Sequence, residues 1–387
     1  MRYEQSFQLS PLLAQHPVAA PFQRMRLERG EVKERIASAL NTDPQRVVVE
    51  RFEPDRSGVV LRCYGWTDRR RIFAKIYLAD SYPAATRLPR FLFPLEHAAR
   101  ISEATRPIGD QVEAEANMVL KFQDLAGNKH TPALLGMSAR NRTLVFEELE
   151  GTRLDRLVKW SRHKQSKAEP STAAMFQAGG WLKQVHDASF EGKEIVDIHE
   201  MLETVGNFLR SERLESTLYA FHALRALENV FQSLGGRGAI SAPVAVSHGD
   251  FSLANLLWDD NRNRLWIIDF EHSRSRTILH DLASIIFNLR ARLLYPLTAG
   301  PSVLALEKAF WNGYGTVDED AVAVVNAIAI ARIFYHLLPR LLTRRARRGL
   351  AAGIAASVYR SVFQPFMIRR VIDFGPCGKS AGKARKL

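Results

Sequence analysis

Three polar residues in the second half of the chain, Asp250, Asn255 and Asp269, have types and spacing suited to binding a metal ion beside phosphate groups. Asp250 and Asn255 precede the apolar run 256–258, and Asp269 follows the apolar run 265–268. The polar residues between these runs predict a turn, and therefore a β-hairpin. Because a hairpin brings its two outer ends together, we expect the three side chains to converge. Two carboxylates and an amide oxygen are hard-oxygen ligands, which suit Mg²⁺ shared with phosphates.

A simpler interpretation of the same stretch is an ordinary β-hairpin with polar ends. Asp and Asn are common turn residues, so either residue alone carries little weight. What favours a chemical site is that further charged residues occur upstream, each in an element that could present it to the same ligand.

The first part of the chain predicts a helix followed by an antiparallel sheet. Apolar residues at helical spacing predict a helix over 31–40. Strand-like runs follow at 47–52, 58–64 and 71–78, with turn residues between them. The third run contains Lys75 in apolar surroundings, and an inward-facing lysine costs free energy unless it is paired. A lysine on the exposed face of an edge strand is the alternative.

A predicted helix over 112–120 carries two candidate partners for this lysine, Glu113 and Glu115. At 3.6 residues per turn their side chains lie roughly 160° apart around the helix axis. Only one of the two glutamates can therefore face Lys75.

The loop His248-Gly-Asp-x-x-x-x-Asn255 and the sequence Asp269-Phe-Glu271 together resemble the catalytic core of aminoglycoside phosphotransferases and choline kinases, a family with the protein-kinase-like fold. The resemblance implies that ATP is the phosphoryl donor and that Mg²⁺ accompanies it. It also implies that Asp250 orients the acceptor hydroxyl or takes its proton, while Asn255 and Asp269 hold the metal.

The same resemblance indicates which residues bind the nucleotide. Lys75 is expected to hold the α- and β-phosphates, with Glu113 as its partner, because the first glutamate of the family's Glu-Ala-Glu helix has that role. The run Leu-Val-Phe-Glu-Glu-Leu-Glu-Gly resembles the family's hinge between lobes, where backbone groups near Glu148 and Leu149 bind the adenine edge. Gly58 is all that remains of a glycine-rich phosphate loop, and an ordinary turn glycine is the alternative.

Three more residues resemble positions with a structural role in the family. His186 ends a predicted helix over 175–186, and we expect it and His248 to have structural roles. Asp281 lies at the start of a predicted helix over 279–286. There its carboxylate is expected to brace the catalytic loop by hydrogen bonds.

The predicted fold class is α+β, a two-lobed protein-kinase-like fold with an N-terminal antiparallel sheet, one main helix beside it, and a larger, mostly helical C-terminal lobe. Residues 1–148 are expected to form the nucleotide-binding lobe and residues 149–375 the helical catalytic and acceptor lobe. Residues 376–387 are expected to form a basic, disordered tail. Further helices are expected at 154–160, 195–210 and 217–234.

The composition is that of a soluble globular protein, with 387 residues, of which 46% are hydrophobic and 25% charged. Two cysteines far apart in sequence argue against a disulfide framework or a zinc site. The N-terminus lacks the apolar core of a signal peptide, and the longest apolar run, 321–331, is too short to span a bilayer. A reducing cytoplasm fits these features best.

The sequence therefore predicts an ATP- and Mg²⁺-dependent phosphotransferase that acts on a hydroxyl group of a small molecule, sugar or glycolipid. Glu271, where protein kinases have glycine, restricts the backbone and favours a constitutively formed site. The alternative is a catalytically silent kinase-fold module that binds a membrane or a protein partner. Nucleic acid is not expected as a partner, because the arginines lack the interleaved aromatic residues of recognised motifs.

The distribution of charge suggests the kind of acceptor. The net charge is +13, and the stretch from Arg332 to Ile372 holds nine arginines and no acidic residue. Arg344, Arg347 and Arg348 fall on one face of a helix by spacing, and like charges so placed repel each other. A solvated helix face is the alternative. We expect instead an anionic acceptor, either a phosphorylated or acidic sugar or a glycolipid, with peripheral contact to the inner face of an anionic membrane.

Overall fold

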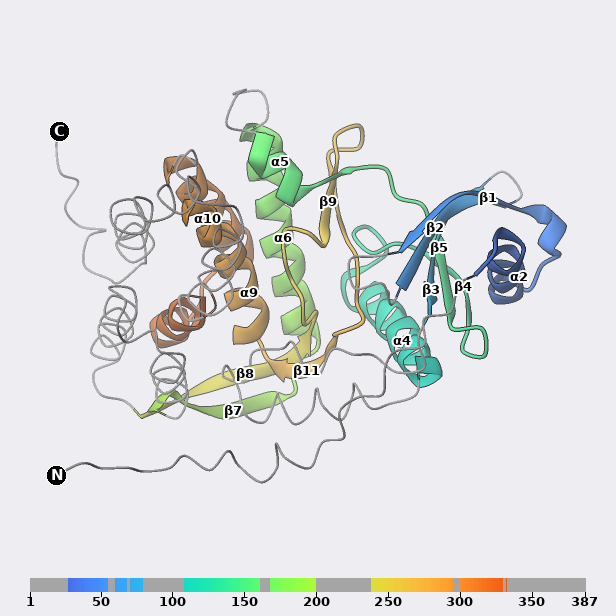
Figure 1. Cartoon of the computed structure of the whole chain (residues 1–387). Coiled ribbons are helices and arrows are strands. Elements are labelled where there is room, and N and C mark those ends of the chain that lie inside the picture. Colours follow the sequence, from blue (N-terminus) through green and yellow to red (C-terminus); the bar gives the residue numbers. More distant parts are fainter. Residues whose placement is uncertain are drawn as a thin grey trace, which may run out of the picture. The chain divides into compact units, whose positions relative to one another are not determined.

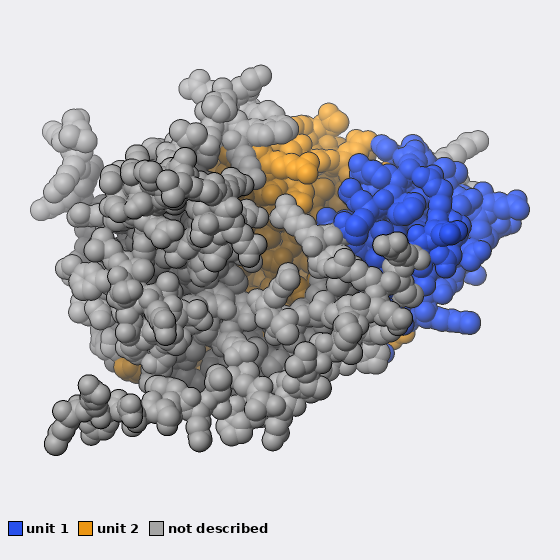
Figure 2. All heavy atoms as spheres, in the orientation of Figure 1, with its two compact units in different colours: residues 1–88, 99–112, 135–145 blue, residues 89–98, 113–134, 146–387 orange. Residues whose placement is uncertain are grey.

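The computed structural model describes residues 27–54, 60–67, 70–78, 108–160, 168–199, 238–294, 300–329 and 332. Several expected features lie outside the described residues, namely Gly58, Arg344, Arg347, Arg348 and the tail 376–387. The chain divides into two compact units (Figure 2). Unit 1 comprises residues 1–88, 99–112 and 135–145, and unit 2 comprises residues 89–98, 113–134 and 146–387.

The N-terminal elements form a five-stranded sheet. Its spatial order is β1 (Val47–Pro54), β2 (Val60–Thr67), β3 (Arg70–Tyr77), β5 (Thr143–Glu147) and β4 (Leu134–Ser138). The pairs β1–β2 and β2–β3 are antiparallel, as expected, with Val47 opposite Thr67 and Val60 opposite Tyr77. A short 3-10 helix, Pro44–Arg46, leads into β1.

One face of this sheet is covered by α2 (Arg29–Leu40), which matches the helix expected at 31–40. The helix contributes Val32 and Ile36 to a buried core that also contains Ile72, Ala74 and Ile76 of β3. Successive side chains of a strand point to opposite faces. Lys75 therefore lies on the face of β3 opposite to the one that packs against α2.

Unit 2 is largely helical and also contains two small three-stranded sheets (Figure 1). The helices are α4 (Ile108–Ala126), whose first turn belongs to unit 1, and α5 (Leu154–Trp160), α6 (Ala168–Ala188), α9 (Leu279–Arg290) and α10 (Gly300–Tyr314). One sheet has the order β10 (Arg264–Ile267), β9 (Leu256–Asp259), β6 (Thr152–Arg153). The other has the order β11 (Arg274–Thr277), β8 (Ala239–Ser247), β7 (Gly192–Asp197). A 3-10 turn, Ala291–Leu294, follows α9.

The predicted hairpin is confirmed. β9 and β10 pair antiparallel, with Asp259 opposite Arg264 and Leu256 opposite Ile267. Asp259 caps the turn, because its Oδ1 accepts hydrogen bonds from the backbone N–H groups of Asn261 and Arg262. The residues just before β9 and just after β10 are thereby brought together.

The expected helix over 195–210 is wrong at its start. Residues 195–197 belong to β7, which pairs antiparallel with β8. The adjacent Ile195 and Val196 are β-branched and suit a strand, but their partners in β8 are more than forty residues away, so the local pattern does not reveal the pairing. Residues 200–237 lie outside the described part of the chain.

β8 escapes prediction because it contains Pro243, and proline normally argues against a central strand. Pro243 lies level with Lys193 of β7, while β11 reaches only as far as Val244, opposite Thr277. The carbonyl of Pro243 accepts a hydrogen bond from Ile278 N, just beyond the end of β11. Proline has no N–H to donate, but at this position β11 has already ended. The sheet therefore loses no hydrogen bond between strands.

Within the described residues, no helix combines the length and the apolar character needed to cross a membrane.

Candidate active site

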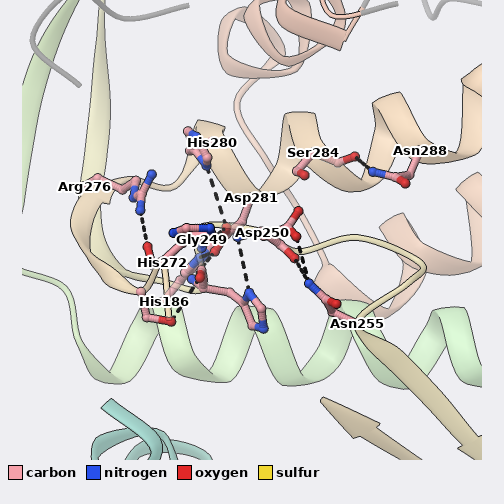
Figure 3. Close-up of polar contacts among 12 residues, drawn as sticks. His186, Gly249, Asp250, Asn255, His272, Arg276, His280, Asp281, Ser284 and Asn288 are labelled. Carbon is pink, nitrogen blue, oxygen red and sulfur yellow. Dashed lines mark hydrogen bonds and ion pairs between the residues drawn. The ribbon is translucent and has the colours of Figure 1, made fainter. Parts of the chain in front are cut away.

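The 248–255 loop joins β8 to β9 and carries Asp250 and Asn255, two of the three polar residues expected to converge. Asn255 Nδ2 donates hydrogen bonds of 2.9 Å to both the carboxylate Oδ2 and the backbone oxygen of Asp250 (Figure 3). The backbone N–H of Asn255 also donates to Ser252 O at 2.9 Å, which closes the loop as a turn. Asn255 is buried and Asp250 is half-buried. The Asp250 carboxylate is thus fixed in direction and still accessible.

Asp281, in the first turn of α9, binds the backbone of this loop. Its carboxylate accepts hydrogen bonds from His248 N at 2.6 Å and from Gly249 N at 2.9 Å. Gly249 has φ +84°, and a Cβ there would lie 2.0 Å from the carbonyl oxygen of His272, so only glycine fits. The predicted role of Asp281 as a brace of the loop is confirmed.

The Asp281 side chain is completely buried and remains ionised. Burial on its own raises the pKa of Asp281. Contacts with His186 and His280 outweigh burial, and they hold the pKa of this carboxyl well below its usual value. A permanent negative charge therefore lies beneath the backbone amides that precede Asp250.

His248 has the structural role expected of it. Its Nδ1 accepts a hydrogen bond from Asp250 N at 3.3 Å, so its Nε2 carries the hydrogen that it donates to Ile268 O at 3.1 Å. The ring also packs in an aromatic cluster of buried side chains from α4, α6, the loop and the residue after Asp269. This cluster comprises Phe122, Trp181, Phe251 and Phe270, with ring centroids of neighbouring members 4.9–5.8 Å apart.

Asp269 lies two residues after the end of β10 and has φ +73°, in the left-handed region that is costly for a residue with a side chain. The residue before it, Ile268, donates a hydrogen bond from its backbone N–H to Asn255 O at 3.0 Å. Asp269 is therefore adjacent in sequence to a residue that is bonded directly to Asn255. A strained backbone persists only where its surroundings enforce it, and such positions cluster at functional sites. The structure therefore brings Asp250 and Asn255 into direct contact and places Asp269 beside them.

Lys75 is 7% exposed within β3, which is unusual for a lysine and shows that it is not on an exposed strand face. Of its two candidate partners, Glu113 is exposed, whereas Glu115 is 2% exposed. Glu115 is three residues after buried Val112 and four before buried Val119, so it shares their face of α4. Glu115 therefore lies on the packed face of α4 and Glu113 on its exposed face. Which of them pairs with Lys75 stays a prediction.

The segment predicted to form the hinge follows β5. β5 ends at Glu147, whose backbone N–H donates to Ala133 O at 3.0 Å, and β6 begins at Thr152. Glu148 and Leu149, between these strands, are half-buried. Their contact with an adenine base stays a prediction.

Sequence reasoning missed two residues that border the buried Asp281 group. Tyr314 of α10 forms a 2.8 Å hydrogen bond with His186 Nδ1, and Arg332 contacts His280 Nε2 at 3.1 Å. Neither lies in a recognisable motif, and each is remote in sequence from its partner. Only the packing of helices reveals them.

Comparison with known proteins agrees with this geometry. The model of the phosphotransferase enzyme family matches residues 64–322, about two-thirds of the chain. No curated protein matches significantly. Among solved structures, a presumed aminoglycoside phosphotransferase from Ralstonia eutropha JMP134 is 12% identical, with a TM-score of 0.52, covering 92% of this chain and 100% of that one.

Two other similar structures have lower scores. An amicoumacin kinase in complex with AMP-PNP and Ca²⁺ is 13% identical, with a TM-score of 0.47 and coverage of 91% of this chain and 95% of that one. A choline/ethanolamine kinase family protein from Mesorhizobium loti is 15% identical, with a TM-score of 0.42 and coverage of 89% and 99%.

The antiparallel N-terminal sheet, the loop–hairpin site and the structural likeness define a kinase-like α+β fold. The chain belongs to the phosphotransferase enzyme family. It is accordingly a phosphotransferase that acts on a hydroxyl group.

Proposed function

We propose that the protein transfers the γ-phosphoryl group of ATP to an acceptor hydroxyl, with Asp250 as general base and Asn255 and Asp269 as ligands of Mg²⁺. The observation that carries the proposal is the pair of hydrogen bonds from Asn255 Nδ2 to Asp250, next to the strained Asp269. Phosphoryl transfer depends mainly on positioning and charge neutralisation. The Asp250 carboxylate, held in a fixed orientation, would position the acceptor. The two oxygen ligands beside it would hold the ion that neutralises charge.

Asp250 has a carboxylate oxygen left for the acceptor. Asn255 occupies Oδ2, while Oδ1 has no hydrogen-bond partner among the described residues. The acceptor hydroxyl would donate its proton to Oδ1 as its oxygen bonds to the γ-phosphorus. The bond between that phosphorus and the β–γ bridging oxygen breaks in the same step, which leaves ADP. General bases of this kind contribute about 10²- to 10⁴-fold to turnover.

The residues present fit a magnesium ion. Because Asn255 Nδ2 is engaged with Asp250, its amide oxygen Oδ1 is the atom left to face a cation. Together with the Asp269 carboxylate this makes a pair of hard-oxygen donors, and Mg²⁺ is typically held by one or two such ligands plus substrate phosphates and water. When bound, the ion would neutralise charge on the phosphate oxygens.

For the nucleotide, we propose Lys75 as the residue that holds the α- and β-phosphates, with Glu115 in place of Glu113 as its partner. The support is the family resemblance, in which this strand lysine pairs with a glutamate of this helix, together with the burial of Glu115 on the packed face of α4. The backbone near Glu148 and Leu149 would bind the adenine edge. These assignments follow the family resemblance, and the described geometry of each element is compatible with them.

The proposed acceptor is anionic, a phosphorylated or acidic sugar or a glycolipid at an anionic membrane surface. The support is the charge of +13 and the acid-free stretch with its nine arginines. A single-sign surface attracts oppositely charged ligands and repels a cationic aminoglycoside. Arg344, Arg347 and Arg348 are the residues proposed to bind the acceptor.

The test is transfer of labelled phosphate from ATP, with and without Mg²⁺, to a panel of phosphorylated sugars, acidic sugars, glycolipids and aminoglycosides. We expect Mg²⁺-dependent transfer to an anionic acceptor, and its loss in Asp250→Asn. Asp269→Asn should additionally abolish the Mg²⁺ dependence of ATP binding. ATP binding that ignores Mg²⁺, with no transfer to any acceptor, would instead indicate a silent binding module.

A further inference from the structure

A buried chain of polar side chains continues outward from Asp281, away from the 248–255 loop. His186, in the last turn of α6, has its Nε2 3.6 Å from Asp281 Oδ2 (Figure 3). On the other side of the same ring, Nδ1 lies 2.8 Å from the hydroxyl of Tyr314. Tyr314 ends α10 and is 2% exposed. The proposed mechanism uses neither His186 nor Tyr314.

Close contact between α6 and α10 places the tyrosine there. A Cβ on Gly179 would lie 2.1 Å from Phe310 O, and a Cβ on Gly313 would lie 2.0 Å from Phe176 O. The two helices therefore touch backbone to backbone at this crossing. Gly179 and His186 are seven residues apart, which puts them on the same side of α6 about 10 Å apart along the axis. The Tyr314 side chain, anchored beside Gly179, and the His186 ring, which points back toward the N-terminus of α6, close that distance together through their hydrogen bond.

The direction of the hydrogen bond follows from the burial of Tyr314. Burial, together with the charges of Asp187 and Asp281, raises the pKa of the Tyr314 hydroxyl, so the hydroxyl keeps its proton. A buried O–H normally has an acceptor, and the acceptor present among the described residues is His186 Nδ1. An Nδ1 that accepts leaves the ring hydrogen on Nε2 in a neutral imidazole. That N–H is aimed at the Asp281 carboxylate.

His280 likewise lies between the Asp281 carboxylate and a second polar side chain, which here is Arg332. Arg332 Nη2 lies 3.1 Å from His280 Nε2, and arginine can only donate. His280 Nε2 therefore accepts, and the ring hydrogen resides on Nδ1, which lies 3.9 Å from Asp281 Oδ1. The two histidines thus present N–H groups to the two oxygens of the Asp281 carboxylate. Tyr314 sets the tautomer of His186, and Arg332 sets that of His280.

We propose that Tyr314 is a positioning residue for phosphoryl transfer, which acts by fixing the tautomer of His186 and thereby the Asp281 carboxylate that holds the 248–255 loop. This inference rests on the proposed function of that loop. Without the tyrosine hydroxyl, the His186 hydrogen can move to Nδ1, and the Nε2 lone pair then faces the carboxylate. Asp281 would shift away from the His248 and Gly249 amides, and Asp250 would lose its alignment.

The direct test is nitrogen NMR of the full chain with ¹⁵N-labelled histidine at neutral pH, with His186 assigned from the His186→Gln spectrum. We expect the parent to show His186 neutral with hydrogen on Nε2, and Tyr314→Phe to show a mixture or the Nδ1–H form. Phe310→Leu is the matched control, because it loosens packing in the same helix but keeps the hydroxyl, and it should leave the tautomer unchanged. A parent ring that is doubly protonated or protonated on Nδ1 would overturn the proposal.

Kinetics supply the second test. Tyr314→Phe should lower kcat about 10- to 100-fold, the scale expected for a small misplacement of a reacting group, while KM for ATP stays within about twofold. A glutamine at position 186 places its amide N–H₂ donor where the His186 Nε2–H lies, and an amide has no ring tautomer that Tyr314 could set. In the His186→Gln background, Tyr314→Phe should therefore have almost no further effect on kcat. Additive effects of the two substitutions would refute a role through His186.

The two readouts separate this inference from the proposed function. If no acceptor is ever phosphorylated, the NMR experiment still decides whether Tyr314 sets the His186 tautomer. If transfer occurs but Tyr314→Phe changes neither the tautomer nor kcat, the inference fails and the proposed function stands.

Discussion

The two segments that present the proposed catalytic residues are held in place by different means. β3 is a regular strand, and Lys75 is directed to one face of it by the alternation of side chains with Ile72, Ala74 and Ile76. The 248–255 loop is irregular, and its position depends on hydrogen bonds that two successive backbone amides donate to the buried Asp281 carboxylate. Orientation in the strand comes from a repeating pattern, whereas orientation in the loop comes from particular atoms.

This difference teaches where substitutions should matter. In the strand, most side chains can change without turning Lys75, because the backbone ladder sets the direction of each residue. In the loop, the positive φ of Gly249 and the charge of Asp281 have no substitutes. We therefore expect effects on turnover and stability to be large around the loop and to decrease toward the exposed part of the sheet.

The largest effect is expected at Asp250. Asp250→Ala should reduce turnover by about 10²- to 10⁴-fold, because the general base is lost. Mg²⁺-dependent ATP binding should survive, since Asn255 and Asp269 remain. Steady-state kinetics and nucleotide titration on the same preparation measure the two quantities. Near-normal turnover would show that the loop does not supply the base.

The next effect is expected at Asp281, where Asp281→Asn tests the brace itself. An amide can accept one of the two backbone hydrogen bonds but turns an N–H toward the other donor. We expect the free energy of unfolding, measured by urea denaturation at pH 7, to fall by about 1–3 kcal/mol, the cost of an unsatisfied buried group. Turnover should fall with it.

The pH dependence of that loss has a definite sign. The pKa of Asp281 is lowered in the folded protein, so its ionised form contributes stability above the usual carboxyl pKa of 3.8. That contribution is lost as the pH falls from 3.8 through the lower folded pKa. The stability gap between the parent and Asp281→Asn should therefore be constant near neutrality and narrow below pH 3.8. A gap that widens in acid would contradict the assignment.

Features set by local spacing could be predicted from the sequence. The β9–β10 hairpin is two apolar runs around a polar turn, and its pairing confirms the expectation. The antiparallel strands β1 to β3 follow from the same kind of alternation. The role of Asp281 came from its place at the start of a helix in a resembling motif. In each case the relevant information lies within about 20 residues.

Features set by packing between distant segments could not be predicted. β7 and β8 pair across a long interval, and Pro243 hides the strand that contains it. Tyr314 reaches His186 only because glycines let α6 and α10 touch, which spacing along one helix does not show. Glu115 is an intermediate case. Its helical phase with Val112 and Val119 is visible in the sequence, while the family analogy favours Glu113, and which glutamate pairs with Lys75 stays a prediction.

A smaller effect is expected on α4, where the two glutamates can be compared directly. Glu115→Gln should weaken ATP binding about 10-fold, because Lys75 loses the charge proposed to orient it and one lost charge-assisted interaction is worth roughly 1.4 kcal/mol or somewhat more. Glu113→Gln is the matched control and should change ATP affinity less than twofold, since that side chain is exposed. Isothermal titration with ATP and Mg²⁺ measures both. The reverse ranking would restore Glu113 as the partner.

The smallest effect is expected at the exposed edge of the unit 1 sheet. Glu50 of β1 lies 3.9 Å from Arg71 of β3 and also accepts a hydrogen bond from Trp66 Nε1, and the Glu50 and Arg71 side chains are 44% and 45% exposed. Exposed ion pairs of this kind contribute only about 0.2–1 kcal/mol, because water and salt screen them.

Glu50→Gln is the same carboxylate-to-amide change as Asp281→Asn, and it keeps an oxygen that can accept from Trp66. We expect the free energy of unfolding to change by less than about 0.5 kcal/mol and kcat to stay at the parental value, and raising the salt concentration should remove even this difference. Measured side by side in urea, the two variants compare a charge at the exposed edge of a sheet with a charge that holds an irregular loop. Equal losses of stability would mean that the sheet depends on individual side-chain bonds as much as the loop does.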